Sequence, residues 1–127
     1  MRLRAAFAPN VLIFADHMVK HATPLAPVDE AQMARDLRER GLADAVIISG
    51  RETGAPADID RLANTRNAID APILIGSGLT PEDAASYAAA DGAIVGTSVK
   101  RDGNVAMPVD PARVERVVRA FRQPVVR

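Results

Sequence analysis

The chain has 127 residues, the length of one ordinary domain. Its sixteen basic and sixteen acidic side chains cancel, so no net field draws the protein to nucleic acid or to an anionic membrane surface. Cysteine is absent, which excludes disulfides, thiolate nucleophiles and cysteine metal sites. Only 3% of the residues are aromatic, too few for base-stacking platforms, so the composition predicts a core of Val, Ile, Leu and Ala.

The N-terminal segment bears on localisation. An apolar run over residues 11–15 follows two arginines, but it is too short for a signal peptide and continues into Asp16 and His17. No segment reaches the roughly 18 consecutive apolar residues that a membrane span needs. We expect a soluble, cytoplasmic protein without a transmembrane segment.

Four short apolar runs predict the strands. They cover residues 11–15, 45–48, 72–75 and 93–95. Each run lacks polar alternation and ends near Gly, Ser, Thr or Asp. Such runs are typical of strands that are buried on both faces of a parallel sheet.

Four helical patterns alternate with these runs. We expect helices from about Asp29 to Arg40, from about Asp58, from Thr80-Pro81 and from Asp110-Pro111. Asp29 and Gln32 have capping-box spacing, and Thr-Pro followed by acidic residues is typical of a helix start. Residues 2–8 have the pattern of the end of a further helix. The order β-α-β-α-β-α-β-α predicts an α/β fold with parallel strands and right-handed crossovers, in one domain over residues 1–127.

The third and fourth apolar runs end in glycine-rich segments, Gly76-Ser77-Gly78 and Gly96-Thr97-Ser98. Glycine lets the backbone approach a ligand closely, and free N–H groups at the start of a helix suit an anion. Consecutive strands that end in this way resemble the phosphate site after strands 7 and 8 of (β/α)₈ barrels. We therefore predict that both segments bind a phosphate group. The alternative is that these glycines only shape tight turns.

Other nucleotide-binding motifs fit less well. Gly76 and Gly78 are followed by Pro81 at the position where a dinucleotide-binding fingerprint requires its third glycine. No Walker motif is present. We expect a phosphorylated small molecule as the ligand and no cofactor.

Polar side chains cluster directly after the first run. In α/β barrels the active-site residues lie at the carboxyl ends of the strands. A carboxylate beside a lysine and a histidine can supply a general base, a Schiff-base amine or an electrophile, which makes Asp16, Lys20 and His21 the candidate catalytic residues. Asp16 and Lys20 share strand parity, so a structural ion pair is the alternative. A metal site of Asp16, His17 and His21 matches no strong ligand spacing, and we expect none.

The loop after the second run, residues 51–54, is expected to line the same face. Ser49, Thr53 and Asp58 can contact a substrate there, although Asp58 is equally well explained as a helix N-cap. The charges of residues 35–40 are interpreted as a solvated helix face. No nucleic-acid partner is expected from the arginines opposite the valine stripe of the last helix, which are Arg113, Arg116, Arg119 and Arg122.

Four segments together resemble one protein family. They are VLIFADHMVKHATPL (11–25), ADAVIISGRETGAPADIDRL (43–62), PILIGSGLTPEDAASYAAADGAIVGTSVKRDG (72–103) and PVDPARVERVV (108–118). In this order they are similar to the BtpA/SgcQ family of predicted TIM-barrel proteins, and the likeness covers nearly the whole chain. The resemblance implies a (β/α)₈ barrel, of which this chain would be the C-terminal half, with four βα units equivalent to strands 5–8.

The resemblance implies two classes of function. Some members of the family are linked to photosystem I accumulation at the thylakoid membrane, and others are encoded beside sugar-phosphate uptake genes. The first class is an enzyme of isomerase, lyase or hydrolase type that acts on a small phosphorylated metabolite. The second is a non-catalytic assembly or stability factor, and an inactive truncated remnant is a further alternative. In the family the position of His17 is usually apolar, so the resemblance assigns it no role.

Four strands also imply a partner. Closure of this barrel takes eight strands with a fixed tilt and shear. An isolated half would expose two strand edges and the apolar inner face of its sheet. We therefore expect the chain to form a homo-oligomer or to pair with a separate N-terminal half.

Overall fold

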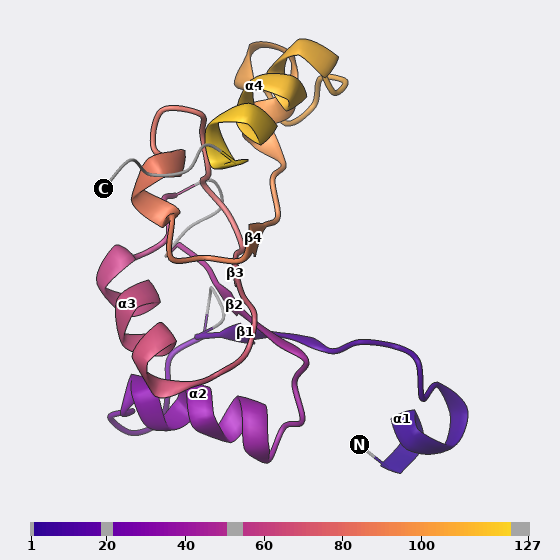
Figure 1. Ribbon diagram of the computed structural model, residues 1–127, viewed down its shortest axis with the longest axis vertical. Coiled ribbons are helices and arrows are strands. Elements are labelled where there is room, and N and C mark those ends of the chain that lie inside the picture. The colour runs from indigo at the N-terminus through magenta and orange to yellow at the C-terminus, as the bar shows by residue number, and fades with distance from the viewer. Residues whose placement is uncertain (1, 19–21, 51–54, 123–127) are drawn as a thin grey trace.

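The computed structural model of the chain describes residues 2–18, 22–50 and 55–122. Its centre is a parallel sheet in the order β1-β2-β3-β4 (Figure 1), so the expected α/β class is confirmed. The strands are β1 (Phe14–His17), β2 (Ala45–Ile48), β3 (Ile73–Ile75) and β4 (Gly92–Ala93). The α-helices are α1 (Arg2–Phe7), α2 (Glu30–Glu39), α3 (Ile59–Ala68) and α4 (Pro111–Arg122). Short 3₁₀ helices are η1 (Ala84–Tyr87), η2 (Thr97–Val99) and η3 (Arg101–Gly103).

Helices α2 and α3 begin where the sequence predicts. The carboxylate of Asp29 accepts the N–H of Gln32 at 3.1 Å, and that of Asp58 accepts the N–H of Arg61 at 3.1 Å. Each bond satisfies an N–H group that the first turn of a helix leaves without a partner. Asp58 therefore has the N-cap role that was one of its two interpretations.

The third expected helix forms only in part. The carboxylate of Asp83 accepts the N–H of Thr80 at 2.8 Å, which is one half of a capping box, but the chain continues as turns and η1. Tyr87 in η1 is buried, and its hydroxyl donates to the carbonyl of Ala57 at 3.0 Å. The neighbouring alanines favour an α-helix, but the burial of Tyr87 and its bond to Ala57 hold this segment as turns and a 3₁₀ helix instead. The first and fourth strands also differ in their bounds from the predicted runs 11–15 and 93–95.

The longest helix of the described residues is α4, with 12 residues. It begins at Pro111 as expected and packs against η1 and η2. The sequence predicts an apolar stripe of Val114, Val117, Val118 and Phe121 on this helix. Val117 is buried and Val114 and Phe121 pack against the core, whereas Val118 is 41% exposed. Within the described ranges, no helix combines the length and the apolar composition that a membrane crossing needs.

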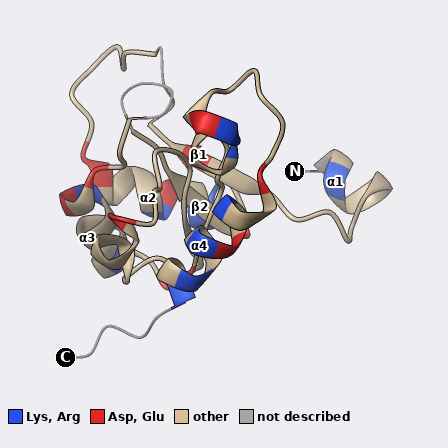
Figure 2. Cartoon of the chain, turned by 90° about the horizontal axis from the view of Figure 1, so that it is seen from above, with Lys and Arg blue, Asp and Glu red and all other residues tan. Residues whose placement is uncertain are grey.

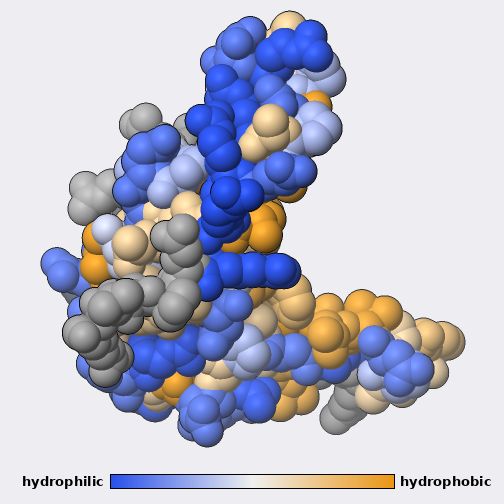
Figure 3. Space-filling view, turned by 45° about the horizontal axis from the view of Figure 1, so that its top comes forward, coloured by the Kyte–Doolittle hydropathy of each residue, from blue (hydrophilic) through white to orange (hydrophobic). Residues whose placement is uncertain are grey.

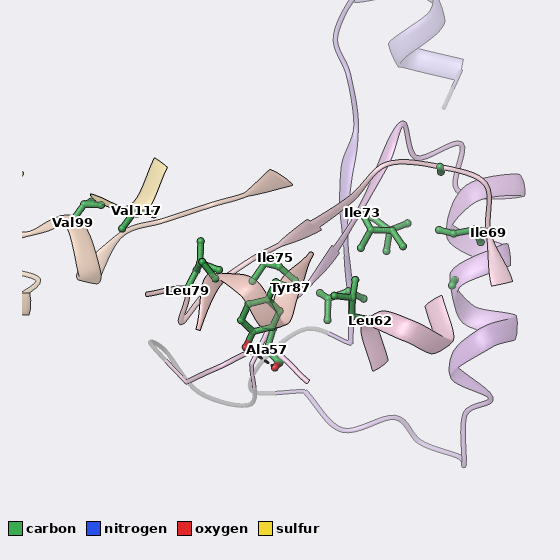
Figure 4. Close-up of a cluster of buried hydrophobic side chains, with 14 residues drawn as sticks. Ala57, Leu62, Ile69, Ile73, Ile75, Leu79, Tyr87, Val99 and Val117 are labelled. Carbon is green, nitrogen blue, oxygen red and sulfur yellow. Dashed lines mark hydrogen bonds between the residues drawn. The ribbon is translucent and has the colours of Figure 1, made fainter. Parts of the chain in front are cut away.

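The core lies between the sheet and its helices. Every second residue of β2 and β3 points into the core, and each of these side chains is 0% exposed: Val46, Ile48, Ile73 and Ile75. Figure 4 shows Tyr87 near Ile75 and Leu79 of the same buried cluster, with its hydroxyl bonded to Ala57. One face of the sheet is therefore buried by α2, α3 and η1.

The opposite face of the sheet carries no helix among the described residues. One row of register partners crosses this face and consists of Asp16, Ile47, Leu74 and Gly92. Strand alternation places Phe14 and Ile94 on the same side, and they are 51% and 49% exposed. We call the surface formed by these six residues the open face. Figure 3 shows apolar surface gathered in the hollow beside the N-terminal segment.

Asp44 fixes the amino-terminal ends of β1 and β2. Its carboxylate accepts the N–H of Ile13 at 2.7 Å and pairs with the guanidinium of Arg4 at 3.1 Å. The pKa of Asp44 is lowered, chiefly by the N–H of Ile13 and further by Arg4. The carboxylate thus joins α1, β1 and β2.

Asp91 has the same role at β3 and β4. Its carboxylate accepts the N–H of Ile73 at 2.7 Å and pairs with Arg66 of α3. Burial raises the pKa of Asp91, but the N–H of Ile73 and the charge of Arg66 outweigh it, and the net shift is downward. The two aspartates therefore form matching clamps, one for each pair of strands.

We predict that Asp91→Asn lowers the free energy of unfolding by about 1 kcal/mol at pH 7, because it replaces a charged acceptor with a neutral one. The folded pKa lies below the unfolded value of about 4, so the wild-type contribution is present above pH 4 and is lost as the pH falls through the folded pKa. The deficit of the variant should therefore shrink in acid. Urea unfolding from pH 7 to pH 2 measures this, with exposed Asp70→Asn as the control. A deficit that stays constant down to pH 2 would contradict it.

Candidate functional site

A cavity of about 370 Å³ lies at the carboxyl ends of β3 and β4. It is lined by the two glycine-rich segments, residues 76–78 and 96–98, with Leu79, Thr80, Ile94 and Val95. Because β3 and β4 are adjacent and parallel, their carboxyl ends meet at one edge of the sheet. The structure thus brings together all six residues that the sequence grouped as a phosphate site. We call this space the loop cavity.

Three residues that line the loop cavity have backbone N–H groups without an acceptor among the described residues. The N–H of Gly76 donates to the carbonyl of Ile48 at 2.7 Å and continues the sheet. By contrast, the N–H groups of Gly78, Gly96 and Thr97 have no acceptor among the described residues. Unpaired N–H groups in a concave surface are partial positive charges that an anion can accept.

Two of the three hydroxyl groups in these segments hold the loops. The hydroxyl of Ser77 accepts the N–H of Gly50 at 3.2 Å and donates to the carbonyl of Ala55 at 3.4 Å. The hydroxyl of Ser98 donates to the carbonyl of Leu79 at 2.7 Å and joins the two loops directly. The hydroxyl of Thr97 has no such bond within the described residues, so it is the one that remains available to a ligand.

The glycines of the two segments have different roles. A Cβ atom on Gly76 would lie 2.4 Å from the hydroxyl of Ser49. Gly78 has a φ of +75°, and a Cβ there would lie 2.2 Å from the carbonyl oxygen of Ala55. A Cβ on Gly96 would meet nothing within 4 Å. Close packing therefore explains Gly76, and a positive φ together with close packing explains Gly78, whereas Gly96 has no packing reason.

Asp16 lies on the open face at the end of β1. Its Oδ2 accepts the hydroxyl of Ser49 at 3.2 Å, while its Oδ1 is buried and has no partner among the described residues. Gly76 leaves the space that this hydroxyl occupies. Ser49 therefore stands between Asp16 and the edge of the loop cavity.

The hydroxyl of Ser49 orients the carboxylate of Asp16, which was not predicted from the sequence. The predicted contact of Ser49 with a substrate stays a prediction. In the sequence, the only signal for the hydrogen bond to Asp16 was strand alternation, which places Ser49 on the same face of the sheet as Ile47. Ser49 lies two residues beyond Ile47, which is the register partner of Asp16. That pairing becomes visible only when the strand register is known.

His17 lies on the other side of β1. It is fully buried beneath α2, with its Nε2 2.9 Å from the carbonyl oxygen of Glu30. Burial lowers the pKa of His17, and the carbonyl and carboxylate of Glu30 oppose this shift only in part. Because Asp16 and His17 face opposite sides of the sheet, they cannot ligate one ion. Across the described residues, no three His, Cys, Asp or Glu side chains are grouped to hold a metal.

Three residues of the sequence prediction lie outside the described residues. They are Lys20 and His21, the expected partners of Asp16, and Thr53 of the loop after β2. The predicted roles of these three stay predictions, and so does the ion pair of Asp16 with Lys20.

An ion pair that the sequence did not suggest crosses the helical layer beside His17. The guanidinium of Arg61 in α3 binds both carboxylate oxygens of Glu30 in α2, at 2.9 to 3.2 Å. The two residues are 31 positions apart, so no local spacing pointed to the contact. It fixes the helix whose carbonyl group contacts His17.

Comparison with known proteins agrees with the family resemblance. The BtpA family profile matches residues 1–123. The chain is 38% identical to the photosystem I biogenesis protein BtpA of Synechocystis, over 97% of this chain and 44% of that protein. It is 38% identical to an uncharacterized protein of Thermococcus kodakarensis, over 95% and 46%, and 40% identical to one of Archaeoglobus fulgidus, over 96% and 47%. The chain spans about half the length of the curated relatives it matches. It belongs to the BtpA family.

Proposed function

We propose that the protein binds a small phosphorylated metabolite, with the phosphate group in the loop cavity. The observation that carries the proposal is that Gly96 and Thr97 line the cavity and that their N–H groups have no acceptor among the described residues. At Gly96 a Cβ atom would meet no protein atom within 4 Å. A missing side chain at the wall of a cavity lets a ligand approach the backbone closely. The neighbouring N–H groups of Gly96 and Thr97 would then donate to phosphate oxygens.

The size and chemistry of the loop cavity suit such a ligand. Its volume of about 370 Å³ is that of a site for a small molecule. None of its lining residues is charged, so N–H groups and the hydroxyl of Thr97 would carry the binding. Leu79, Ile94 and Val95 would contact the carbon skeleton.

Asp16 is the group proposed to meet the reacting carbon. Its Oδ1, which has no partner among the described residues, can accept a proton, and the hydroxyl of Ser49 fixes the carboxylate plane. Lys20 and His21, if they lie beside it, would add an amine and an imidazole. These groups suit isomerase, lyase or hydrolase chemistry.

We further infer that the single domain of residues 1–127 is half of a (β/α)₈ barrel and that the open face becomes the barrel interior. The sheet has the parallel order that four βα units require. The two outer strands, β1 and β4, each have one edge without a partner strand in the described part of the chain. A second copy of the chain, or a separate N-terminal half, would pair with these edges and cover Phe14 and Ile94.

A non-catalytic assembly factor is the second candidate. The name of the Synechocystis relative, a photosystem I biogenesis protein, favours it. Exposed apolar side chains near the N-terminus, Leu3 at 73% and Phe7 at 82%, would suit a protein partner. This role would not depend on the loop cavity.

The first prediction from the proposed function concerns the affinity for inorganic phosphate. Gly96→Val should weaken binding of inorganic phosphate at least about tenfold, because a side chain at this lining residue would hinder the approach of an anion to the N–H groups of Gly96 and Thr97. Thr97→Ser keeps the hydroxyl and should change the affinity little. Calorimetry gives the affinities, and amide NMR shifts of residues 96–98 give the location. Shifts confined to other residues, or none at millimolar phosphate, would sink the proposal.

The second prediction separates chemistry from binding. Asp16→Asn should abolish turnover of any sugar phosphate that the wild-type chain converts, because an amide cannot accept the proton. Its affinity for inorganic phosphate should stay within about twofold. Mass spectrometry of a panel of sugar phosphates, incubated with each protein, detects the products. Equal losses of turnover and phosphate affinity would instead indicate a structural role for Asp16.

The third prediction concerns assembly. The purified chain should self-associate, because an exposed apolar sheet face and two free strand edges favour association. Phe14→Asp on the open face should reduce the assembly, whereas Leu25→Asp in an exposed loop should not. Light scattering measures the mass of each protein. A stable wild-type monomer with cooperative unfolding would refute the half-barrel proposal.

A further inference from the structure

A second cavity, of about 210 Å³, shares lining residues with the loop cavity. Thr80 and Ser98 line both. The second cavity is also lined by Arg113 and Arg116 from the first half of α4. Two guanidinium groups therefore lie next to a cavity whose own lining carries no charge.

Neither guanidinium is fully engaged within the described residues. The nearest carboxylate to Arg113 is that of Asp110, with an N···O distance of 3.9 Å, which is too long for a hydrogen bond. Arg116 forms no ion pair in this part of the chain. The two arginines are three positions apart and so share one side of α4, and Figure 2 shows the basic groups spaced along this helix. Both therefore retain donors for a ligand.

We propose that Arg113 and Arg116 bind a second anionic group of the same ligand. The ligand would thus carry two neighbouring anionic groups, of which a diphosphate is the simplest. This rests on the proposed function, since the first phosphate occupies the loop cavity. A planar guanidinium can donate two parallel hydrogen bonds to one phosphate or carboxylate. The N–H groups of the loops supply only partial charges, so a doubly anionic ligand needs these cations.

Glu82 allows a substitution that should strengthen binding of a diphosphate, whereas the arginine substitutions should weaken it. It is exposed and lines the second cavity with the two arginines. Its carboxylate repels an anion bound there and offsets part of their charge. Removal of this charge should strengthen binding of a diphosphate.

The experiment compares inorganic phosphate with pyrophosphate, by calorimetry on the full chain at matched ionic strength. Pyrophosphate should bind about tenfold more tightly than phosphate. Arg113→Met and Arg116→Met should each weaken pyrophosphate binding about fivefold and leave phosphate binding within about twofold. Glu82→Gln should strengthen pyrophosphate binding. Arg122→Met, in the last turn of the same helix and outside both cavities, is the matched control and should change neither affinity.

The outcomes separate this inference from the proposed function. If phosphate shifts the amides of residues 96–98 but pyrophosphate binds no more tightly, the second subsite is absent and the phosphate site stands. The same conclusion follows if the arginine variants weaken both ligands equally. If neither anion shifts those amides, both proposals fail. Because Arg116 is exposed, its variant carries the test even if Arg113→Met does not fold.

Discussion

The parallel register of the four strands is the constraint on which the candidate site depends. It aligns the carboxyl ends of β3 and β4, so that their loops enclose one cavity, and it brings Ser49 to Asp16. A slip of one residue in β1 would turn Asp16 toward α2 and His17 toward the open face. The clamps of Asp44 and Asp91 oppose such a slip at the other end of the sheet, because each binds the backbone of the neighbouring strand. Charges at one edge therefore maintain the geometry at the other.

In the loops of the candidate site, some polar groups are used to hold the loops, and others have no internal partner among the described residues and could bind a ligand. Ser77 and Ser98 use their hydroxyls to bind backbone groups. Gly76 and Gly78 lie where a Cβ atom would clash with neighbouring atoms. Changes at these positions would disturb the loops themselves and would report on folding as much as on binding. The N–H and hydroxyl of Thr97 and the N–H of Gly96 have no such role among the described residues. This division is what makes position 96 informative about a ligand.

The sequence predicted what local patterns control, and it missed what distant contacts control. The N-caps at Asp29 and Asp58 depend on residues three positions away; the first was predicted, and the second was one of the two interpretations of Asp58. The third helix is shortened where Tyr87 bonds to Ala57, which is 30 positions distant. Likewise, the bond between Asp16 and Ser49 spans 33 positions and required the register. The glycine motif predicted the location of the cavity, but only the packing of the folded chain distinguishes a glycine that its neighbours require from one that they do not.

The arginines of α4 show how a neutral chain could still attract an anion. Zero net charge gives little long-range attraction, so any attraction must come from local groups. Backbone N–H dipoles act over a few ångströms and would determine how a phosphate fits inside the loop cavity. Full charges act over a Debye length of about 8 Å at physiological salt, and Arg113 and Arg116 line the second cavity. In the proposed arrangement the dipoles would orient the first anionic group and the arginines would capture the second. The arginine contribution would therefore be the one that salt weakens first.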